Sequence, residues 1–153
     1  MDLISTQENI TDDTLYINKY NYGGLGIRGN RLWNRADSLS FQQDALFLTS
    51  EGKTRIEANH SRPRWTAMYG ETEKGRAGIA VFDHPKNFRH PQTVRVHLEM
   101  PYLCLAPMVE AAMYIAPGAT YESHYRIVTF DGPPDAKRLE AMWVEYAKPP
   151  VVQ

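Results

Sequence analysis

The chain has little cysteine. Cys104 is the single cysteine among 153 residues, so no disulfide can form within the chain and a cysteine-based metal cluster is excluded. Cys104 lies in the apolar run 102–106, where a buried, unreactive thiol is expected rather than a nucleophile.

An excess of charge of one sign is also missing. The 17 Lys and Arg residues nearly balance the 18 Asp and Glu residues, which gives a formal net charge of −1. Binding to a nucleic-acid backbone needs a concentrated positive surface, so no nucleic-acid partner is expected. A glycine-rich phosphate loop is absent as well, because residues 23–26 lack the GxGxxG spacing and no helix pattern follows them.

Long hydrophobic runs are absent. No stretch approaches the ~18 apolar residues of a membrane span, so no membrane partner is expected. Residues 1–13 contain neither the basic nor the apolar segment of a signal peptide, which predicts a cytoplasmic location.

What the chain does contain is a series of short strand-like runs separated by Gly, Pro, Asn and Asp. A length of 153 residues suits one domain. The strand patterns cover residues 14–17, 25–28, 45–49, 65–70, 77–82, 94–98, 112–115 and 121–130. One helix is expected over about 134–147, because Leu139, Met142, Trp143 and Tyr146 follow helical spacing. The sequence therefore predicts an all-β antiparallel sandwich with one C-terminal helix (domain 13–148), a flexible N-terminal segment (1–12) and a tail (149–153).

The most unusual stretch is FDHPKNFRHP, residues 82–91. It holds two His-Pro pairs, and proline restricts the residue before it to extended backbone, so His84 and His90 are expected in stiff, non-helical geometry. Asp83 and Arg89 stand beside them. Just downstream, the period of two in 94–98 places Arg95, His97 and Glu99 on one face.

Three functional interpretations remain open. Asp83, His84, His90 and His97 could ligate zinc or iron, since imidazole and carboxylate suit those metals. Alternatively, His84 or His90 could work with Glu99 as an acid-base pair. Binding without catalysis would use a further set of residues, which could hold a polyol or a sugar acid: Arg28, Arg64, Trp65, Arg89 and His97.

A structural explanation stands beside these interpretations. The His-Pro pairs could simply fix a long loop, with their imidazoles bonded to backbone groups. Arg64 could likewise stack on a tryptophan at the surface. The sequence itself names no cofactor.

Several segments resemble one known family. They are GGLGIR (23–28), EGK (51–53), RWTAMYG (64–70), IAVFDHPKNFRHP (79–91), APG (116–118) and YRIVTFDG (125–132). Together they are similar to the soluble bacterial family labelled "methane oxygenase PmoA", over residues from about 13 to 147. The resemblance implies that the chain corresponds to the C-terminal half of such proteins, since their motif DHPHHRGLW is absent here. The label implies a membrane copper enzyme, which the lack of a spanning segment argues against.

The same family looks distantly similar to galactose-mutarotase-like supersandwich proteins, which implies a sugar as small-molecule ligand. Two hypotheses follow. The first is a carbohydrate-related domain that binds or acts on a sugar through a face rich in His and Arg. The second is a non-catalytic half-domain whose unpaired sheet edges pair with a second copy or with a missing N-terminal half.

Overall fold

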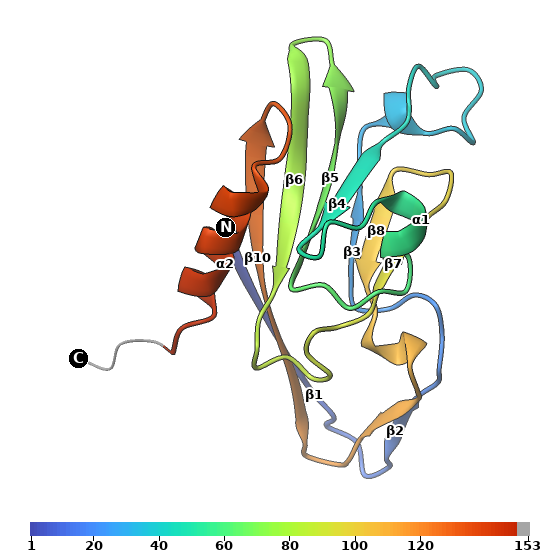
Figure 1. Cartoon of the computed structure of the whole chain (residues 1–153). Helices are drawn as coiled ribbons and strands as arrows, with labels where there is room; N and C mark the ends of the chain where they lie inside the picture. Colours follow the sequence, from blue (N-terminus) through green and yellow to red (C-terminus); the bar gives the residue numbers. More distant parts are fainter. Residues whose placement is uncertain (150–153) are drawn as a thin grey trace.

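Two antiparallel sheets face each other in the computed structural model, which describes residues 1–149 (Figure 1). The five-stranded sheet has the order β1 (Asp2–Glu8), β10 (Thr120–Asp131), β6 (Gly75–Asp83), β5 (Trp65–Thr72) and β4 (Leu46–Thr49). The three-stranded sheet has the order β3 (Leu25–Arg28), β8 (Tyr102–Leu105) and β7 (Val94–Val96).

Smaller elements complete the fold. A two-stranded ribbon is formed by β2 (Leu15–Ile17) and β9 (Met113–Ile115). The helices are α1 (Arg55–Ala58) and α2 (Ala136–Tyr146), with 3-10 turns at Arg31–Trp33 and Pro107–Val109. The predicted all-β sandwich with one C-terminal helix is therefore confirmed, and the short α1 was not predicted.

The main core lies between the two sheets. Met68, Val81 and Tyr125 extend from the five-stranded sheet and meet Leu103 and Leu105 from the three-stranded sheet. The period of two along each strand produces this arrangement, because alternate side chains point into the same layer.

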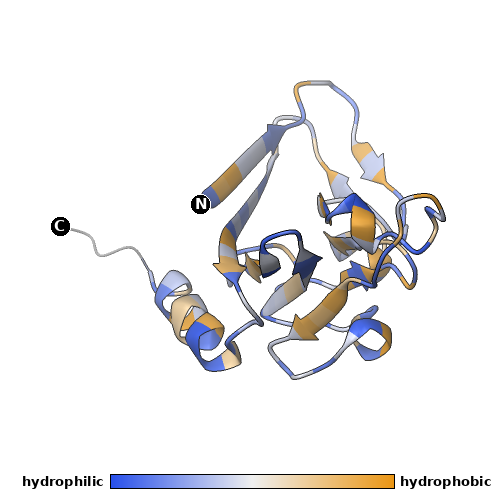
Figure 2. Cartoon of the chain, turned by 90° about the horizontal axis from the view of Figure 1, so that it is seen from above, coloured by the Kyte–Doolittle hydropathy of each residue, from blue (hydrophilic) through white to orange (hydrophobic). Residues whose placement is uncertain are grey.

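The helix α2 covers the opposite face of the five-stranded sheet, away from the three-stranded sheet (Figure 2). Leu139 is buried there, and Met142, Trp143 and Tyr146 pack beside it against the outer face. The predicted apolar stripe is thus confirmed. Asp135 caps the helix by accepting a hydrogen bond from the backbone N–H of Arg138 at 3.0 Å, so α2 begins two residues later than predicted.

The prediction of a flexible segment over 1–12 was wrong for residues 2–8. They form β1, which pairs with β10 from Asp2↔Arg126 to Glu8↔Thr120. In β1, Leu3 is the residue that packs against the main core, so the segment lacks the apolar alternation that marks a strand. Residues 150–153 of the predicted tail lie outside the described residues.

Two further differences concern the three-stranded sheet. Residues 102–105 form the strand β8, which the sequence pattern presented only as an apolar run. The strand predicted over 94–98 ends at Val96, because the backbone N–H of His97 bonds to Tyr102 O at 2.9 Å and closes a hairpin. His97 and Glu99 therefore lie in the β7–β8 loop rather than on a strand face.

Replacing Leu103 by alanine should lower the free energy of unfolding by roughly 2–5 kcal/mol, because it leaves a cavity in the packed layer between the sheets. Urea unfolding measures this loss. The matched control is Leu39→Ala, since the Leu39 side chain is 93% exposed and should change the stability by less than about 0.5 kcal/mol. Equal losses in both variants would contradict the assignment of the core.

Candidate functional site

Asp83 lies at the centre of the stretch that the sequence singled out. It ends β6 and is fully buried. Its carboxylate pairs with His90 Nδ1 at 2.8 Å and accepts hydrogen bonds from the backbone N–H of Gln92 and from Asn87 Nδ2, both at 2.7 Å. A buried carboxylate is stable only with such hydrogen-bond partners, and all three come from the connection between β6 and β7.

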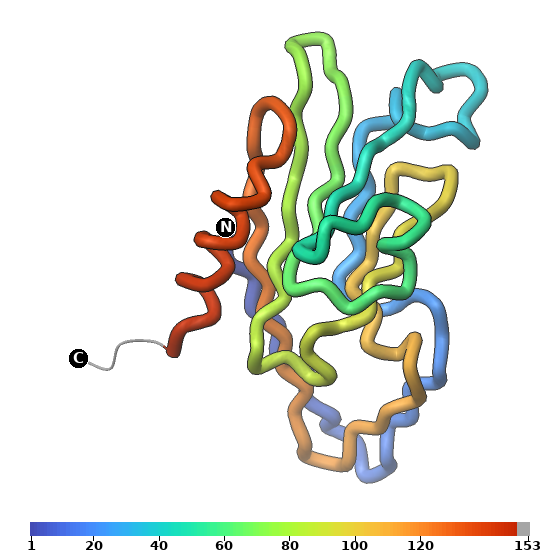
Figure 3. The backbone as a smooth tube through the Cα atoms, in the orientation of Figure 1, coloured from blue at the N-terminus to red at the C-terminus, as the bar shows by residue number. Residues whose placement is uncertain are grey.

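This connection, which we call the His-Pro loop (residues 84–93), runs across one end of the sandwich (Figure 3). Asn87 ties it to β10: its Nδ2 donates to His124 O and its Oδ1 accepts from the backbone N–H of His124, both at 2.7 Å. The guanidinium of Arg62 donates to Pro91 O at 2.7 Å from outside. These bonds hold the loop in one conformation.

His90 is oriented by two neighbours. Its ring stacks on Trp143, with centroids 6.1 Å apart and planes 8° apart, and Trp143 Nε1 donates to Asp83 O at 2.9 Å. A carboxylate oxygen only accepts, so Nδ1 of His90 carries the proton that faces Asp83. When the ring carries this single proton, its Nε2 atom is an acceptor.

His84 has the opposite arrangement of protons. Its Nδ1 accepts a hydrogen bond from the backbone N–H of Lys86 at 3.1 Å, which leaves Nε2 as the donor. Burial lowers the pKa of His84 below its ordinary value, and the nearby His124, Lys86 and His90 lower it further. His84 is therefore a neutral ring near pH 7.

Other rings gather around these two histidines. The ring of His84 lies 5.5 Å from that of His124 and 4.9 Å from that of Tyr146. His124 Nε2 pairs with the carboxylate of Glu122. We define the imidazole cluster as five residues from the His-Pro loop, β10 and α2: His84, His90, His124, Trp143 and Tyr146.

An arginine beside the imidazole cluster is neutralised by an aspartate. The guanidinium of Arg126 lies 4.5 Å over the ring of Tyr146 and makes a two-point ion pair with Asp2, at 2.6 and 2.7 Å. Burial raises the pKa of Tyr146, so its hydroxyl stays protonated. Because Arg126 is paired with Asp2, it does not add an unpaired positive charge to the cluster.

Of the predicted catalytic residues, the structure brings His84 and His90 together but not Glu99. Glu99 is exposed in the β7–β8 loop, at the far end of β7 from the His-Pro loop. Within residues 1–149 it makes no hydrogen bond or ion pair with either histidine. The carboxylate that faces His90 is Asp83, which the sequence interpretation had placed in a metal site.

Two predicted binding residues, Arg28 and His97, also lie apart from the cluster. His97 Nδ1 accepts from the backbone N–H groups of Glu99 and Met100 at 3.1 and 3.0 Å, which closes the hairpin. Burial and the charge of Arg95 lower the pKa of His97. Arg28 lies over the ring of Tyr102 at 5.6 Å, on β3.

Arg89 has a structural role. Its guanidinium donates to the carbonyl oxygens of Pro107, Ala111 and Ala112 at 2.7, 2.6 and 3.0 Å. These bonds attach the His-Pro loop to the segment before β9. The side chain therefore holds the backbone together, and it also lines an open cavity beside β9.

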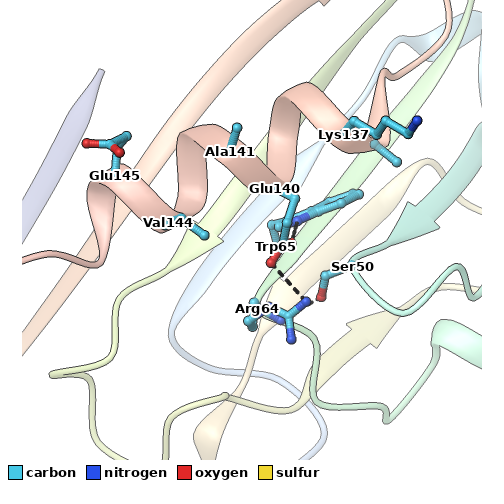
Figure 4. Close-up of a pocket in the computed structure, with 9 residues that line it drawn as sticks. Ser50, Arg64, Trp65, Lys137, Glu140, Ala141, Val144 and Glu145 are labelled. Carbon is cyan, nitrogen blue, oxygen red and sulfur yellow. Dashed lines mark hydrogen bonds and ion pairs between the residues drawn. The ribbon is translucent and has the colours of Figure 1, made fainter.

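Arg64 and Trp65, the remaining predicted binding residues, line an open cavity of about 610 Å³ beside α2 (Figure 4). Glu140 joins them there, since it pairs with Arg64 at 3.0 Å and accepts from Trp65 Nε1 at 2.8 Å. The Trp65 ring itself is buried. Arg64 also lies 5.4 Å over the ring of Trp143, which agrees with the stacking alternative.

The set of ligands expected for a metal does not assemble. Among residues 1–149 there is no group of three or more His, Cys, Asp or Glu side chains arranged to hold a metal ion. Of the four predicted ligands, His97 lies in another loop, and Asp83 already has three hydrogen-bond partners.

The sequence interpretation missed four residues of the site: Asn87, His124, Trp143 and Tyr146. His124 could have been found from the alternation of β10, which places Glu122, His124 and Arg126 on one face. Trp143 and Tyr146 were recognised as a packing stripe. Their contacts with the histidines depend on where α2 lies on the sheet, which the stripe alone does not reveal.

Comparison with known proteins gives one match. Residues 1–144 match the profile described as "Family of unknown function (DUF6807)", so the chain belongs to that family. No curated protein and no solved structure matches the chain. The resemblance to the PmoA-labelled family and to mutarotase-like proteins stays a prediction. No helix within residues 1–149 has the length and apolar character needed to cross a membrane.

Replacing Asp83 by asparagine should lower the free energy of unfolding by roughly 1–3 kcal/mol. The carboxylate accepts hydrogen bonds at both oxygens, whereas an amide would place its NH2 group against one of these donors and lose that bond. Urea unfolding tests this. Asp131→Asn is the control, because Asp131 is an exposed aspartate on the neighbouring strand. A loss at position 83 no larger than at position 131 would contradict the central role of Asp83.

The lowered pKa of His84 predicts a pH dependence. Neutral His84 favours the folded state above its ordinary pKa of 6.5. Below that pH the unfolded chain binds a proton at His84 more readily than the folded chain does. The contribution of neutral His84 to stability is therefore lost as the pH falls through the folded pKa. His84→Asn keeps an acceptor for the N–H of Lys86 but cannot titrate. Its melting temperature should therefore fall less than that of the unmodified chain between pH 7.5 and 5. Identical slopes would contradict the prediction.

Proposed function

We propose that the imidazole cluster binds a neutral, hydroxyl-bearing ligand, a sugar or a related polyol, and that His90 and His84 act on it as base and acid. One observation carries the proposal. The buried Asp83 carboxylate fixes the proton of His90 on Nδ1, whereas the N–H of Lys86 fixes the proton of His84 on Nε2. The two rings therefore offer an acceptor at position 90 and a donor at position 84 of one loop.

This complementary pair suits a hydroxyl group. A hydroxyl donates one hydrogen bond and accepts others, so the hydroxyl groups of one ligand can donate to His90 Nε2 and accept from His84 Nε2–H. An anionic ligand would need a free cation. The pKa of His84 is lowered and Arg126 is paired with Asp2, so these two groups suit a neutral ligand, and the carboxylate of a sugar acid would have to bind the exposed Lys86 beside His84.

The same geometry supports proton transfer. A carboxylate bonded to Nδ1 holds an imidazole in one orientation and stabilises the imidazolium that forms when Nε2 takes a proton. Asp83 is thus a positioning residue for His90. In this proposal His90 with Asp83 takes the role of the base that the sequence interpretation gave to Glu99. The resemblance to mutarotase-like proteins supports a sugar as the ligand.

Replacing both His84 and His90 by asparagine should weaken the binding of a neutral sugar about 5- to 100-fold, because two hydrogen bonds of about 0.5–1.5 kcal/mol each are lost. Asparagine keeps a polar group where Nδ1 stands and removes Nε2, so the loop retains its internal bonds. Isothermal calorimetry over a panel of neutral sugars and sugar acids measures the change.

His97→Ala is the matched control, since His97 belongs to the β7–β8 loop and its loss should leave the affinity unchanged. Circular dichroism verifies that both variants fold. Unchanged binding in the double variant would refute the proposal. Stoichiometric zinc or iron in the purified protein, lost in the double variant, would refute it in favour of the metal alternative.

A further inference from the structure

We infer that the free edge of β1 pairs with β1 of a second copy of this chain, which joins two five-stranded sheets into one. β1 is an edge strand, bonded to β10 on one side. Within residues 1–149, no other segment pairs with its outer side. The outer edge of β1 contains no residue of the imidazole cluster.

The hydrogen bonds at the two ends of β1 show which backbone groups are free. Met1 and Ile127 exchange bonds of 2.9 and 2.8 Å, and the N–H of Asn9 bonds to Ala119 O at 3.0 Å. The register is continuous between them. Bonded residues alternate in an antiparallel ladder, so the odd-numbered residues bond to β10. The backbone N–H and C=O groups of the even-numbered residues therefore point out of the sheet: Asp2, Ile4, Thr6 and Glu8.

This edge has none of the usual protection against pairing. Natural edges are blunted by proline, lysine, bulges or short length, but β1 is seven residues long and holds its two charges at its ends. Ile4, an apolar β-branched residue, is 64% exposed at its middle. The opposite edge, β4, is four residues long, and the guanidinium of Arg55 donates to Ala45 O beside it at 2.7 Å.

A second copy is the occupant that this edge fits best. In a twofold antiparallel pair, outward-facing residues must oppose outward-facing residues, which allows few registers. The register that places Asp2 opposite Glu8 is disfavoured, because like charges would face each other twice. The register that places Ile4 opposite Ile4 of the other copy, and Asp2 opposite Thr6, has no such pair and buries the exposed isoleucine.

The predicted assembly has a defined shape. The twofold axis would run through the sheet at Ile4, perpendicular to it, so both α2 helices would lie on the same face. In Figure 2, β1 lies at the border of the fold, as its edge position in the five-stranded sheet requires.

Charge substitutions at Ile4 test the contact and its register together. The unmodified chain should show a concentration-dependent dimer in sedimentation and light scattering. Ile4→Lys and Ile4→Glu should each be monomeric, because like charges would meet at the axis. An equimolar mixture of the two variants should dimerise again. Amide hydrogen exchange at the even-numbered Ile4 and Thr6 should slow on dimerisation, while the odd-numbered amides of β1, which bond to β10, stay protected in both states.

The control is Ile10→Lys, which adds the same charge at an 87% exposed isoleucine outside β1 and should leave the dimer intact. A chain that remains monomeric up to millimolar concentration overturns the inference. So does a dimer that survives Ile4→Lys, since its contact must lie elsewhere. Variants that are monomeric alone and in the mixture overturn the register around Ile4.

Discussion

The buried carboxylate of Asp83 holds the remainder of the site in place. An unpaired charge inside a protein costs several kcal/mol, so Asp83 must collect donors, and it does so from three positions of the His-Pro loop. Its own carbonyl oxygen accepts from Trp143, which attaches α2 to the end of β6. Loop, helix and sheet therefore meet at one residue.

The chemistry of the histidines follows from these constraints. His90 and His84 have the same side chain, yet one presents an acceptor outward and the other a donor, because a carboxylate holds the first Nδ1 and a backbone N–H holds the second. The His90 ring also lies parallel to that of Trp143. The loop thus distinguishes the two imidazoles by the partner that it gives each Nδ1, a carboxylate for His90 and a backbone N–H for His84.

Much of the fold could be predicted, and the reason is visible strand by strand. β5 and β6 contain runs of consecutive buried residues, and β10 and α2 show period-two and helical apolar spacing, so the patterns of all four elements are strong. β1 was missed because its stability comes from backbone bonds to β10, which leave no apolar signal beyond Leu3. Neither sheet order nor the hairpin that ends β7 at Val96 is encoded in local periodicity.

The candidate site was also predicted only in part, because local sequence shows which residues are close along the chain but not which ones the fold brings together. His84 and His90 lie in one short loop, so their proximity follows from the chain itself. The carboxylate that pairs with His90 could not be predicted in this way. Asp83 and Glu99 were both candidates, and only the tertiary fold shows that Asp83 is the partner. Trp143 was assigned to packing, and it does pack, but the same indole also orients His90 and bonds to Asp83.

The strand β10 connects the site to the sheet edge. The pairing of β10 with β6 ends at Tyr125↔Asp83. From His124 back to Thr120, β10 pairs with β1 on one side. On the other side, the backbone of His124 bonds to the side chain of Asn87. His124 stands directly opposite Ile4 in the β1 register. The placement of an imidazole in the cluster therefore depends on β1, the strand that local sequence patterns describe least well. Any strand that pairs with the free edge of β1 would stiffen the backbone that carries His124.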